Sequence, residues 1–507
     1  MPGQPADNWY LYDPATDHVP GIGLFRAQRE LLARRVPART VVVAVIDNGV
    51  DTTHSALRPQ MWANPREIPG NGRDDDGDGY VDDIRGWNLI GGKNGRNVDH
   101  DTYELTRLAA ACSDTMGGQR RLPQSYRDRC PQLISEFIRK RGELEQSMGN
   151  VRQIEGLMAQ INPRLQRALG TDSLTAAKVA ALQTANDTLR QAKQLFLRLA
   201  AQGLTAKVVE DAKKSFEGQL QYGFNLSFDP RPIVGDDYPD TLIKNYGNSD
   251  VIGAGAMHGT HVAGIIGGLA TAQGATGIAQ SVRIMALRTV PDGDERDKDI
   301  ALAIRYAVDH GAQIINMSFG KGHSPYKNLV DAAVRYADSK GVLMVHAAGN
   351  EGAAAGQQPS FPTPFYLDGG RARNWIEVGA SSWKGTDSLA ASFSNYGREQ
   401  VDVFAPGEDI NSTVPGNRYE KESGTSMASP VVAGVAALLM SYFPTLSSAD
   451  VKRIIVESST KYAEQMVVRP GDGSGPQIRF GDLSAAGGIV NVYNAVLMAD
   501  KLTGARP

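Results

Sequence analysis

Three residues of the chain are of the types that together perform nucleophilic acyl transfer. Asp47 follows the apolar run VVVAVI, His258 opens the segment HGTHVAG, and Ser426 lies within GTSMASP. A serine hydroxyl is a weak nucleophile until an imidazole accepts its proton, and the imidazole needs a carboxylate that fixes its tautomer. Each segment by itself is weak evidence, because an Asp at a strand end is usually structural. All three together, each at the end of an expected strand or helix, favour a catalytic site.

The segments IDNGVDTTH, HGTHVAG and GTSMASP closely resemble the signature segments of subtilisin-like serine proteases, the subtilases (peptidase family S8). The resemblance covers about residues 38–100 and 246–460. It implies that Asp47 is the orienting acid, His258 the general base and then acid, and Ser426 the nucleophile of a serine endopeptidase.

The same resemblance implies an oxyanion donor and the walls of a substrate pocket. HAAGNEG puts Asn350 where the family supplies a side-chain amide, and the backbone N–H of Ser426 is the expected second donor. The alternative for Asn350 is a turn residue beside Gly349. Lys321 stands where a second Gly is common, which leaves the width and charge preference of the pocket open. The expected pocket residues, which would flank the pocket for the residue before the scissile bond and pair with a substrate strand, are Met317, Ser318, Phe319, Gly320, Ala347, Ala348 and Gly349.

A loop at 71–83 carries six carboxylates within ten residues, in an order that is typical of calcium-binding loops. Alternate Asp residues followed by a Gly resemble an EF-hand loop, although its last ligand position would be Arg85 instead of Glu. The expected ligands of a structural Ca²⁺ are Asp74, Asp76, Asp78, the carbonyl of Tyr80, Asp82 and Asp83. The alternative is a solvated acidic turn. A second acidic cluster, at 292–299, is interpreted as the N-terminal charge of a helix beginning near 299, with a metal site as the alternative. No organic cofactor is expected.

The elements that position these residues alternate between short apolar runs and amphipathic segments. Strands are expected at 41–46, 284–287, 314–317, 343–345 and 376–378, and helices near 299–308, 329–339 and 431–440. This alternation predicts an α/β fold: a doubly wound, mostly parallel sheet with helices on both faces, as in subtilisin. Pro430 suits the first turn of the last helix.

A helical segment interrupts this pattern. Apolar residues recur every seven positions at Leu144, Val151 and Met158, which predicts an antiparallel helical hairpin or all-α subdomain, punctuated at Asn162-Pro163 and Gly170-Thr171. We therefore expect a discontinuous catalytic domain, 1–100 with 246–507, and a mainly helical insertion, 101–245. The hypothesis for this insertion is that it restricts access to the cleft or recruits substrate. The pattern leaves open whether Cys112 and Cys130 form a disulfide or remain two free thiols.

Composition limits the classes of partner. There are 53 Lys plus Arg against 56 Asp plus Glu, a net charge of −3, which argues against a nucleic-acid-binding protein. No apolar run of membrane-spanning length is present and no secretory signal is visible. Family habit and the expected calcium site suggest a periplasmic or secreted protein. Only 46 residues precede Asp47, so a form without its prosegment is expected.

The substrates would be peptides or proteins. The alternatives are a catalytically silent binding module that acts through the helical insertion, and hydrolysis of other acyl groups at the same site.

Overall fold

The computed structural model describes residues 5–114, 122–238, 245–270, 275–357, 359–471 and 475–504. The chain divides into two compact units. We call the first, Met1–Glu104 with Asp229–Pro507, the sheet unit, and the second, Leu105–Phe228, the helical unit.

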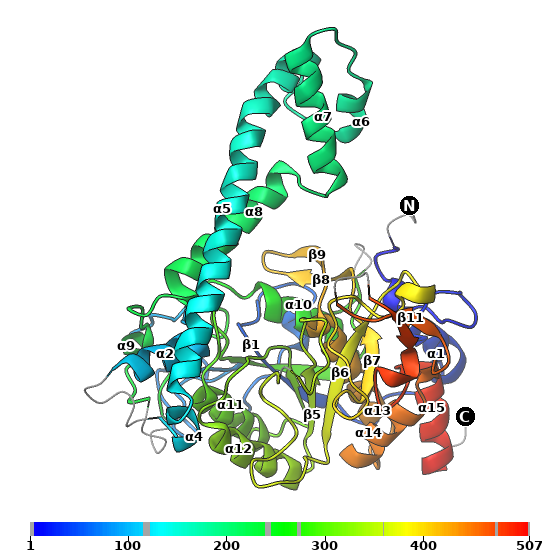
Figure 1. Ribbon diagram of the computed structural model, residues 1–507. Coiled ribbons are helices and arrows are strands. Elements are labelled where there is room, and N and C mark those ends of the chain that lie inside the picture. The colour runs from blue at the N-terminus through cyan, green and yellow to red at the C-terminus, as the bar shows by residue number, and fades with distance from the viewer. Residues whose placement is uncertain are drawn as a thin grey trace. The chain divides into compact units, whose positions relative to one another are not determined.

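The sheet unit is built on a nine-stranded, mostly parallel sheet, which confirms the predicted fold class (Figure 1). All neighbouring strands are parallel except the antiparallel pair β10 and β13. The strands expected from the sequence are all present. In spatial order the strands are β10 (Thr460–Lys461), β13 (Gly488–Ile489), β7 (Val403–Pro406), β6 (Trp375–Ser381), β5 (Leu343–Ala347), β4 (Ile314–Met317), β1 (Val41–Asp47), β3 (Val282–Arg288) and β2 (Gly86–Asn88).

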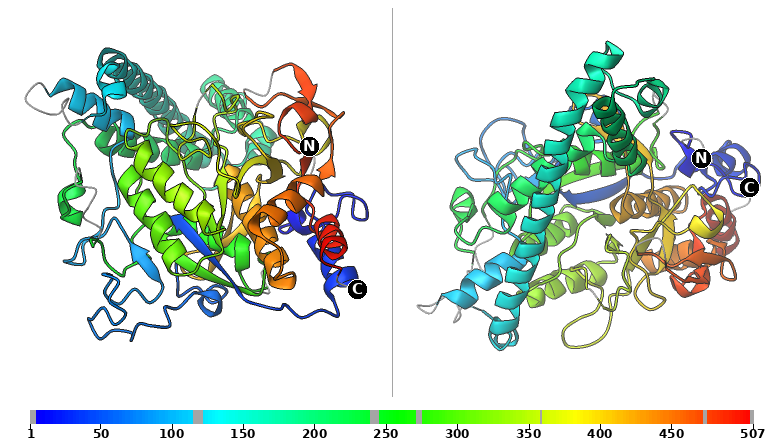
Figure 2. Two further views of the ribbon diagram at one scale, coloured as in Figure 1. Left: turned by 90° about the horizontal axis from the view of Figure 1, so that it is seen from below. Right: turned by 45° about the horizontal axis from the view of Figure 1, so that its top comes forward.

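Both faces of the sheet are covered by helices. Strand β1 has no polar residue before Asp47, as expected of a strand that is buried on both sides. Its Val41, Val43 and Val45 pack with one set of helices, whereas Ala44 and Ile46 pack with the other. Figure 2 (left) shows these sets on opposite sides of β1. One set comprises α10 (Met257–Gly267), α13 (Thr425–Tyr442), α14 (Ser448–Glu457) and α15 (Val492–Thr503), and the other α11 (Asp297–Asp309) and α12 (Lys327–Ser339).

Helix α13 begins earlier than the sequence predicts. It starts at Thr425, so Pro430 lies inside the helix and not in its first turn. Proline has no N–H to donate to the carbonyl four residues before it, which is that of Ser426. The Oγ atom of Ser318 donates to this carbonyl instead, at 2.9 Å. The proline is tolerated because a side chain from another element supplies the missing donor.

Among the described helices, α13 is also the one whose length and hydropathy match a membrane span. However, 89% of its apolar window is buried within the sheet unit. Its apolar character is that of a core helix, because it packs against the strands of the central sheet.

The helical unit has a core of its own. The long α5 (Cys130–Leu169) packs against α7 (Asp187–Ala201) and α8 (Ala206–Gly218), as Figure 1 shows. Helix α5 continues through Pro163, which the sequence predicted as a break, and ends at Leu169, where it is capped by Gly170 with a φ of 63°. Among its described residues, this unit also contains the α-helices α2 (Glu104–Ser113), α4 (Gln124–Arg127) and α6 (Ala176–Ala181). Its buried core consists of Met158, Ile161, Leu165, Val179, Ala192, Leu199 and Val209.

The two cysteines form a disulfide, Cys112–Cys130, within the helical unit. It joins the end of α2 to the start of α5. Of the two possibilities that the sequence left open, the bonded form is therefore the one observed.

Candidate active site

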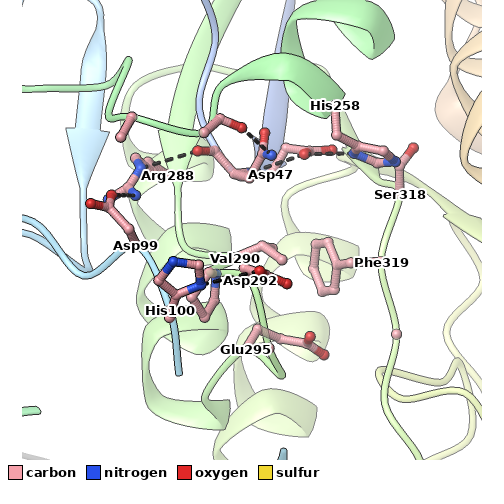
Figure 3. A pocket seen from close by; sticks show the side chains of 16 residues that line it. Asp47, Asp99, His100, His258, Arg288, Val290, Asp292, Glu295, Ser318 and Phe319 are labelled. Carbon is pink, nitrogen blue, oxygen red and sulfur yellow. Dashed lines mark hydrogen bonds and ion pairs between the residues drawn. The ribbon is translucent and has the colours of Figure 1, made fainter. Parts of the chain in front are cut away.

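The carboxylate at the end of β1 and the imidazole at the start of α10 are hydrogen-bonded to each other. The Nδ1 atom of His258 lies 2.8 Å from Oδ1 of Asp47 (Figure 3). The Asp47 side chain is 2% exposed, whereas that of His258 is 37% exposed. A buried carboxylate thus favours the tautomer protonated at Nδ1, and leaves Nε2 able to accept a proton.

Asn48 and Gly259 hold these two elements close together. The backbone N–H of Asn48 donates to Oδ1 of Asp47 at 2.7 Å, and the Asn48 side chain accepts from the backbone N–H of Gly259 at 3.0 Å. A Cβ atom at Gly259 would lie 2.2 Å from the carbonyl oxygen of Gly49, so a larger residue would push α10 away. Sequence reasoning missed Asn48, whose only signal is its position next to Asp47.

Ser426 lies at the start of α13, and its Oγ donates to the carbonyl oxygen of Ser318 at 3.1 Å. Among the described residues, no hydrogen bond joins this Oγ to His258. Rotation about one side-chain bond redirects a serine hydroxyl, and catalytic hydrogen bonds are often long or poorly aligned before substrate binds. The acid–base half of the predicted triad is therefore formed, and the hydroxyl half is not.

A buried polar network holds the first turn of α13. Asn316 donates through Nδ2 to Oγ of Ser318 at 2.9 Å, and Ser429 donates through Oγ to Oδ1 of Asn316 at 2.9 Å. All three side chains belong to buried residues. Sequence reasoning did not identify Asn316 or Ser429 as part of the site. The available signal was the pair of polar residues that flank Met317 at the end of an apolar strand.

The side-chain amide of Asn350 and the backbone N–H of Ser426 face one small space beside Gly424. The Oδ1 atom of Asn350 accepts from N and Oγ1 of Thr425 at 2.8 and 2.9 Å, which leaves its Nδ2 as the available donor. A Cβ atom at Gly424 would lie 3.5 Å from Nδ2 of Asn350 and 3.6 Å from N of Ser426. An oxygen atom bound in this space has two donors within reach.

Opposing effects act on the pKa of His258. Burial lowers it, but the charge of Asp47, the hydrogen bond to Asp47 and the charge of Glu422 together outweigh burial, so that the pKa is raised. Glu422 is the last residue of β9 (Arg418–Glu422), which pairs with β8 (Ile410–Val414). The neighbouring hairpin therefore adds to the basicity of this imidazole.

The second histidine of HGTHVAG has a different role. Burial lowers the pKa of His261 to about 4, so its ring is neutral at neutral pH. Its Nε2 lies 3.0 Å from the carbonyl oxygen of Ile410 and 3.1 Å from that of Glu420, and so donates to both strands of the hairpin. His261 thus ties α10 to β8 and β9.

A cavity of about 560 Å³ adjoins His258 and Asp47. Of the predicted pocket residues, Ser318, Phe319 and Gly320 line it. Met317 is fully buried in the core. Its side chain is thus part of the core, and Met317 is not among the residues that line this cavity.

The remaining predicted pocket residues lie at the end of β5 and directly after it. Ala347 and Ala348 are 3% and 2% exposed, and Ala348 lines a second cavity of about 460 Å³. The backbone N–H of Gly349 donates to Oγ1 of Thr425 at 3.2 Å. This segment therefore contacts the start of α13 directly.

Lys321, which departs from the family pattern, is buried. Its Nζ lies 2.8 Å from Oε2 of Glu104 and 2.9 Å from Oδ1 of Asp297. Its side chain is 2% exposed, so its charge is balanced inside the protein. Asp297 and Asp299 lie in the first turn of α11, in agreement with the interpretation of the second acidic cluster.

The acidic loop brings carboxylates together in two groups, one of them including a residue that sequence reasoning missed. Glu67, Asp74 and Asp76 each offer an oxygen atom, and these atoms lie within 4.8 Å of one another. The Oε2 atom of Glu67 is buried and has no hydrogen-bond partner among the described residues. Glu67 stands seven positions before Asp74, outside the pattern of an EF-hand loop.

The second group joins Asp76 and Asp78 with His310, whose Nε2 lies 2.7 Å from Oδ2 of Asp78. His310 follows α11, 232 positions along the chain, and no local pattern connects it with the loop.

The other predicted ligands bond elsewhere. Asp82 accepts from the backbone N–H groups of Gly70 and Gly72, both at 2.8 Å. Asp83 is fully buried and accepts from Nδ2 of Asn64 at 2.8 Å and from the hydroxyl of Tyr306. The ring of Tyr80 packs edge-on against Trp87 and Tyr306. Asp82 and Asp83 thus belong to neither group, although Oδ2 of Asp83 lies 3.5 Å from Nε2 of His310. That the carbonyl oxygen of Tyr80 is a ligand stays a prediction.

A carboxylate, an imidazole and a hydroxyl at one edge of a doubly wound sheet are the groups of a serine hydrolase. The family model of the subtilases matches residues 38–473. The chain is 36% identical over 322 residues to the thermophilic serine proteinase of Bacillus sp. (strain AK1), covering 62% of this chain and 69% of that protein. It is 37% identical over 213 residues to subtilisin DY of Bacillus licheniformis, covering 41% and 73%. A solved cold-adapted subtilisin-like serine proteinase aligns with a TM-score of 0.37 and 29% identity, covering 50% and 79%.

The chain therefore belongs to the subtilase family and is a serine endopeptidase, a hydrolase that acts on peptides or proteins.

Proposed function

We propose that Asp47, His258 and Ser426 hydrolyse peptide bonds through an acyl-enzyme. The observation that carries this proposal is the 2.8 Å contact between a buried Asp47 and a partly exposed His258. A buried carboxylate that orients a partly exposed imidazole is the arrangement of the acid and the base in a catalytic triad.

In the proposed reaction, Oγ of Ser426 attacks the carbonyl carbon of the substrate and its proton passes to Nε2 of His258. The negative charge that develops on the carbonyl oxygen is stabilised by Nδ2 of Asn350 and N of Ser426. The C–N bond then breaks and the leaving amine takes the proton from His258. A water molecule next attacks the acyl ester, His258 accepts its proton and returns one to Oγ, and the acid is released.

The alternative of a catalytically silent binding module receives no support, because membership of a family of endopeptidases favours activity. Hydrolysis of esters by the same groups remains a prediction, since an acyl-enzyme forms from either substrate.

A fluorophosphonate probe, which reacts with activated serine hydroxyls, tests the assignment. We expect labelling of the wild type and none of Ser426→Ala. Ser423→Ala is a matched control, because this exposed serine lies three positions away and accepts from the backbone N–H of Asp409. Labelling that persists in Ser426→Ala, or that fails in an active wild-type preparation, would refute the role of Ser426.

We further propose a structural Ca²⁺ held by Glu67, Asp74 and Asp76. A buried carboxylate oxygen without a hydrogen-bond donor is unfavourable, and a hard cation satisfies such an oxygen. Imidazole is not a usual ligand of Ca²⁺, so the group that contains His310 is the less suitable of the two. The ion would neutralise the repulsion between the carboxylates and stabilise the loop.

We propose that the protein works outside the cytoplasm. The disulfide Cys112–Cys130 supports an oxidising compartment. A calcium-stabilised loop suits the same environment, because the weak sites of extracellular proteins are filled at millimolar Ca²⁺.

A further inference from the structure

The cavity beside His258 has a wall that the proposed reaction does not use. Asp47, His258 and Ser318 line the part of the cavity nearest the reacting groups. The segment after β3 contributes Asp292 and Glu295 to the same cavity. Figure 3 shows these two carboxylates close to the ring of Phe319, on the far side from Asp47.

The arginine in this wall is already engaged. The side chain of Arg288 is 2% exposed, and its Nη2 lies 3.1 Å from Oδ1 of Asp99 and 2.8 Å from the carbonyl oxygen of Val98. Its Nε donates to the carbonyl oxygen of Asn48 at 3.0 Å. Its positive charge is therefore balanced by Asp99 and directed at backbone oxygens, which leaves little of it for a ligand.

Asp292 keeps its negative charge available to the cavity. Its side chain is 75% exposed, and its neighbour is Nδ1 of His100 at 3.1 Å. That contact is an ion pair only when the imidazole is protonated. Asp292 therefore presents a carboxylate to any group that enters the cavity.

Glu295 is buried at the far end of the wall, with 3% of its surface exposed. Burial raises its pKa to about 8. The charges of Asp294 and Asp297 also raise this pKa, whereas the charge of Lys321 lowers it. A cation bound beside this carboxyl group would favour its ionised form.

We propose that this cavity binds a Lys or Arg side chain of the peptide substrate, on the amino side of the scissile bond, and that Asp292 and Glu295 determine this preference. The proposal rests on the proposed function. The amino side is indicated by Ser318, Phe319 and Gly320, since the subtilase resemblance assigns this segment to the residue before the scissile bond. The methylene groups of a Lys or Arg side chain would pack on the ring of Phe319. A cavity of this volume falls within the usual range for ligand pockets, about 300–1,000 Å³.

Matched peptides test the preference. Four pairs of internally quenched peptides are compared, one pair for each of the four positions before the scissile bond. In each pair, one peptide carries Lys at that position and the other carries norleucine, which has the same methylene chain without the charge. We expect kcat/KM to favour Lys by about tenfold at one position. Asp292→Asn should reduce this ratio about threefold to fivefold, the scale of an exposed ion pair. Glu295→Gln should reduce it at least as much, because Glu295 is buried. The ratio should also fall as ionic strength rises.

Asp387→Asn is the control for a general loss of negative charge. This exposed carboxylate, whose neighbours Thr386 and Ser388 donate to it, does not line the cavity, so the ratio should stay that of the wild type.

The affinity of Ser426→Ala for the same peptides, measured by fluorescence anisotropy, reports the charge preference without turnover. A ratio near one at all four positions, or a ratio unchanged by both substitutions, overturns the proposal. If the norleucine peptides are still hydrolysed in that case, the charge preference has failed and the proposed catalysis has not. If nothing is hydrolysed but Ser426→Ala still binds the Lys peptide about tenfold more tightly, the catalytic assignment has failed and the preference stands.

Discussion

Replacing Asn350 with alanine is expected to lower kcat by about 10²–10³ and to leave KM nearly unchanged. Its Nδ2 is one of two donors at the space beside Gly424. A Cβ atom at Gly424 would lie 3.5 Å from this Nδ2 and 3.6 Å from N of Ser426. A hydrogen bond to the substrate carbonyl strengthens as charge develops on the oxygen, so its loss raises the energy of the transition state more than that of the bound substrate. In serine proteases, subtilisin among them, the loss of one such donor costs about 2.7–4 kcal/mol.

The same substitution weakens the start of α13, because Oδ1 of Asn350 accepts two hydrogen bonds from Thr425. At about 0.5–1.5 kcal/mol each, their loss should lower the free energy of unfolding by about 1–3 kcal/mol. Asn350→Asp separates the two effects, since it keeps the accepting oxygen and replaces the donor with a second oxygen. It should lose at least as much kcat as the alanine variant and less stability.

Steady-state kinetics with a chromogenic peptide and calorimetric unfolding measure both quantities. Asn186→Ala is the matched control, because Asn186 caps α7 in the helical unit by accepting from N of Leu189 at 3.0 Å. It should cost about 1 kcal/mol of stability and leave kcat unchanged. A kcat within threefold of the wild type in both Asn350 variants would refute the reasoning.

Three other predictions concern the surroundings of the site. Glu422→Gln removes a charge that raises the pKa of His258, and because the unprotonated imidazole is the base, the acid limb of kcat/KM against pH should move to lower pH; an unmoved or raised limb contradicts this. Gly424→Ala adds a methyl group where the oxyanion would bind, so kcat should fall at least about tenfold. The melting temperature should change little, because any residue can adopt the φ of 161° at this position. A kcat equal to that of the wild type would argue against this space as the oxyanion site. Ca²⁺ at 100 times its Kd should stabilise the wild type by about 2.7 kcal/mol and raise its melting temperature. Glu67→Gln should lose most of this rise, whereas Asp82→Asn should retain it. A full rise in Glu67→Gln would rule out Glu67 as a ligand.

The fold class was predictable because burial leaves a short-range record in the sequence. A run such as VVVAVI has no polar face, so it suits a strand that is covered on both sides, and the structure buries β1 in this way. The predictions of where helices begin and end were wrong at two prolines, because they too used only the local sequence. Pro430 and Pro163 were interpreted by the local cost of proline, whereas both lie inside helices. At Pro430 the compensation comes from Ser318, 108 positions away from the carbonyl that it satisfies.

The candidate site was predictable to the extent that its groups lie at the ends of elements. The carboxyl ends of parallel strands meet at one edge of a sheet, which is why Asp47, at the end of β1, contacts the start of α10, and Asn350, after β5, contacts the start of α13. The supporting residues were not predictable. Asn316 and Ser429 are 113 positions apart, and Glu67 lies outside the pattern of the loop that it joins.

The sequence by itself determined which reactive groups this protein has and at which ends of which strands and helices they lie, because periodicity and capping are local properties of the chain. Only the tertiary structure decided that Asp47 and His258 are in contact, that Asn350 and Ser426 share one space, and that two carboxylates form the far wall of the cavity. Each of these distances joins residues that are far apart in the chain, and they become fixed only when the two faces of the sheet are packed together.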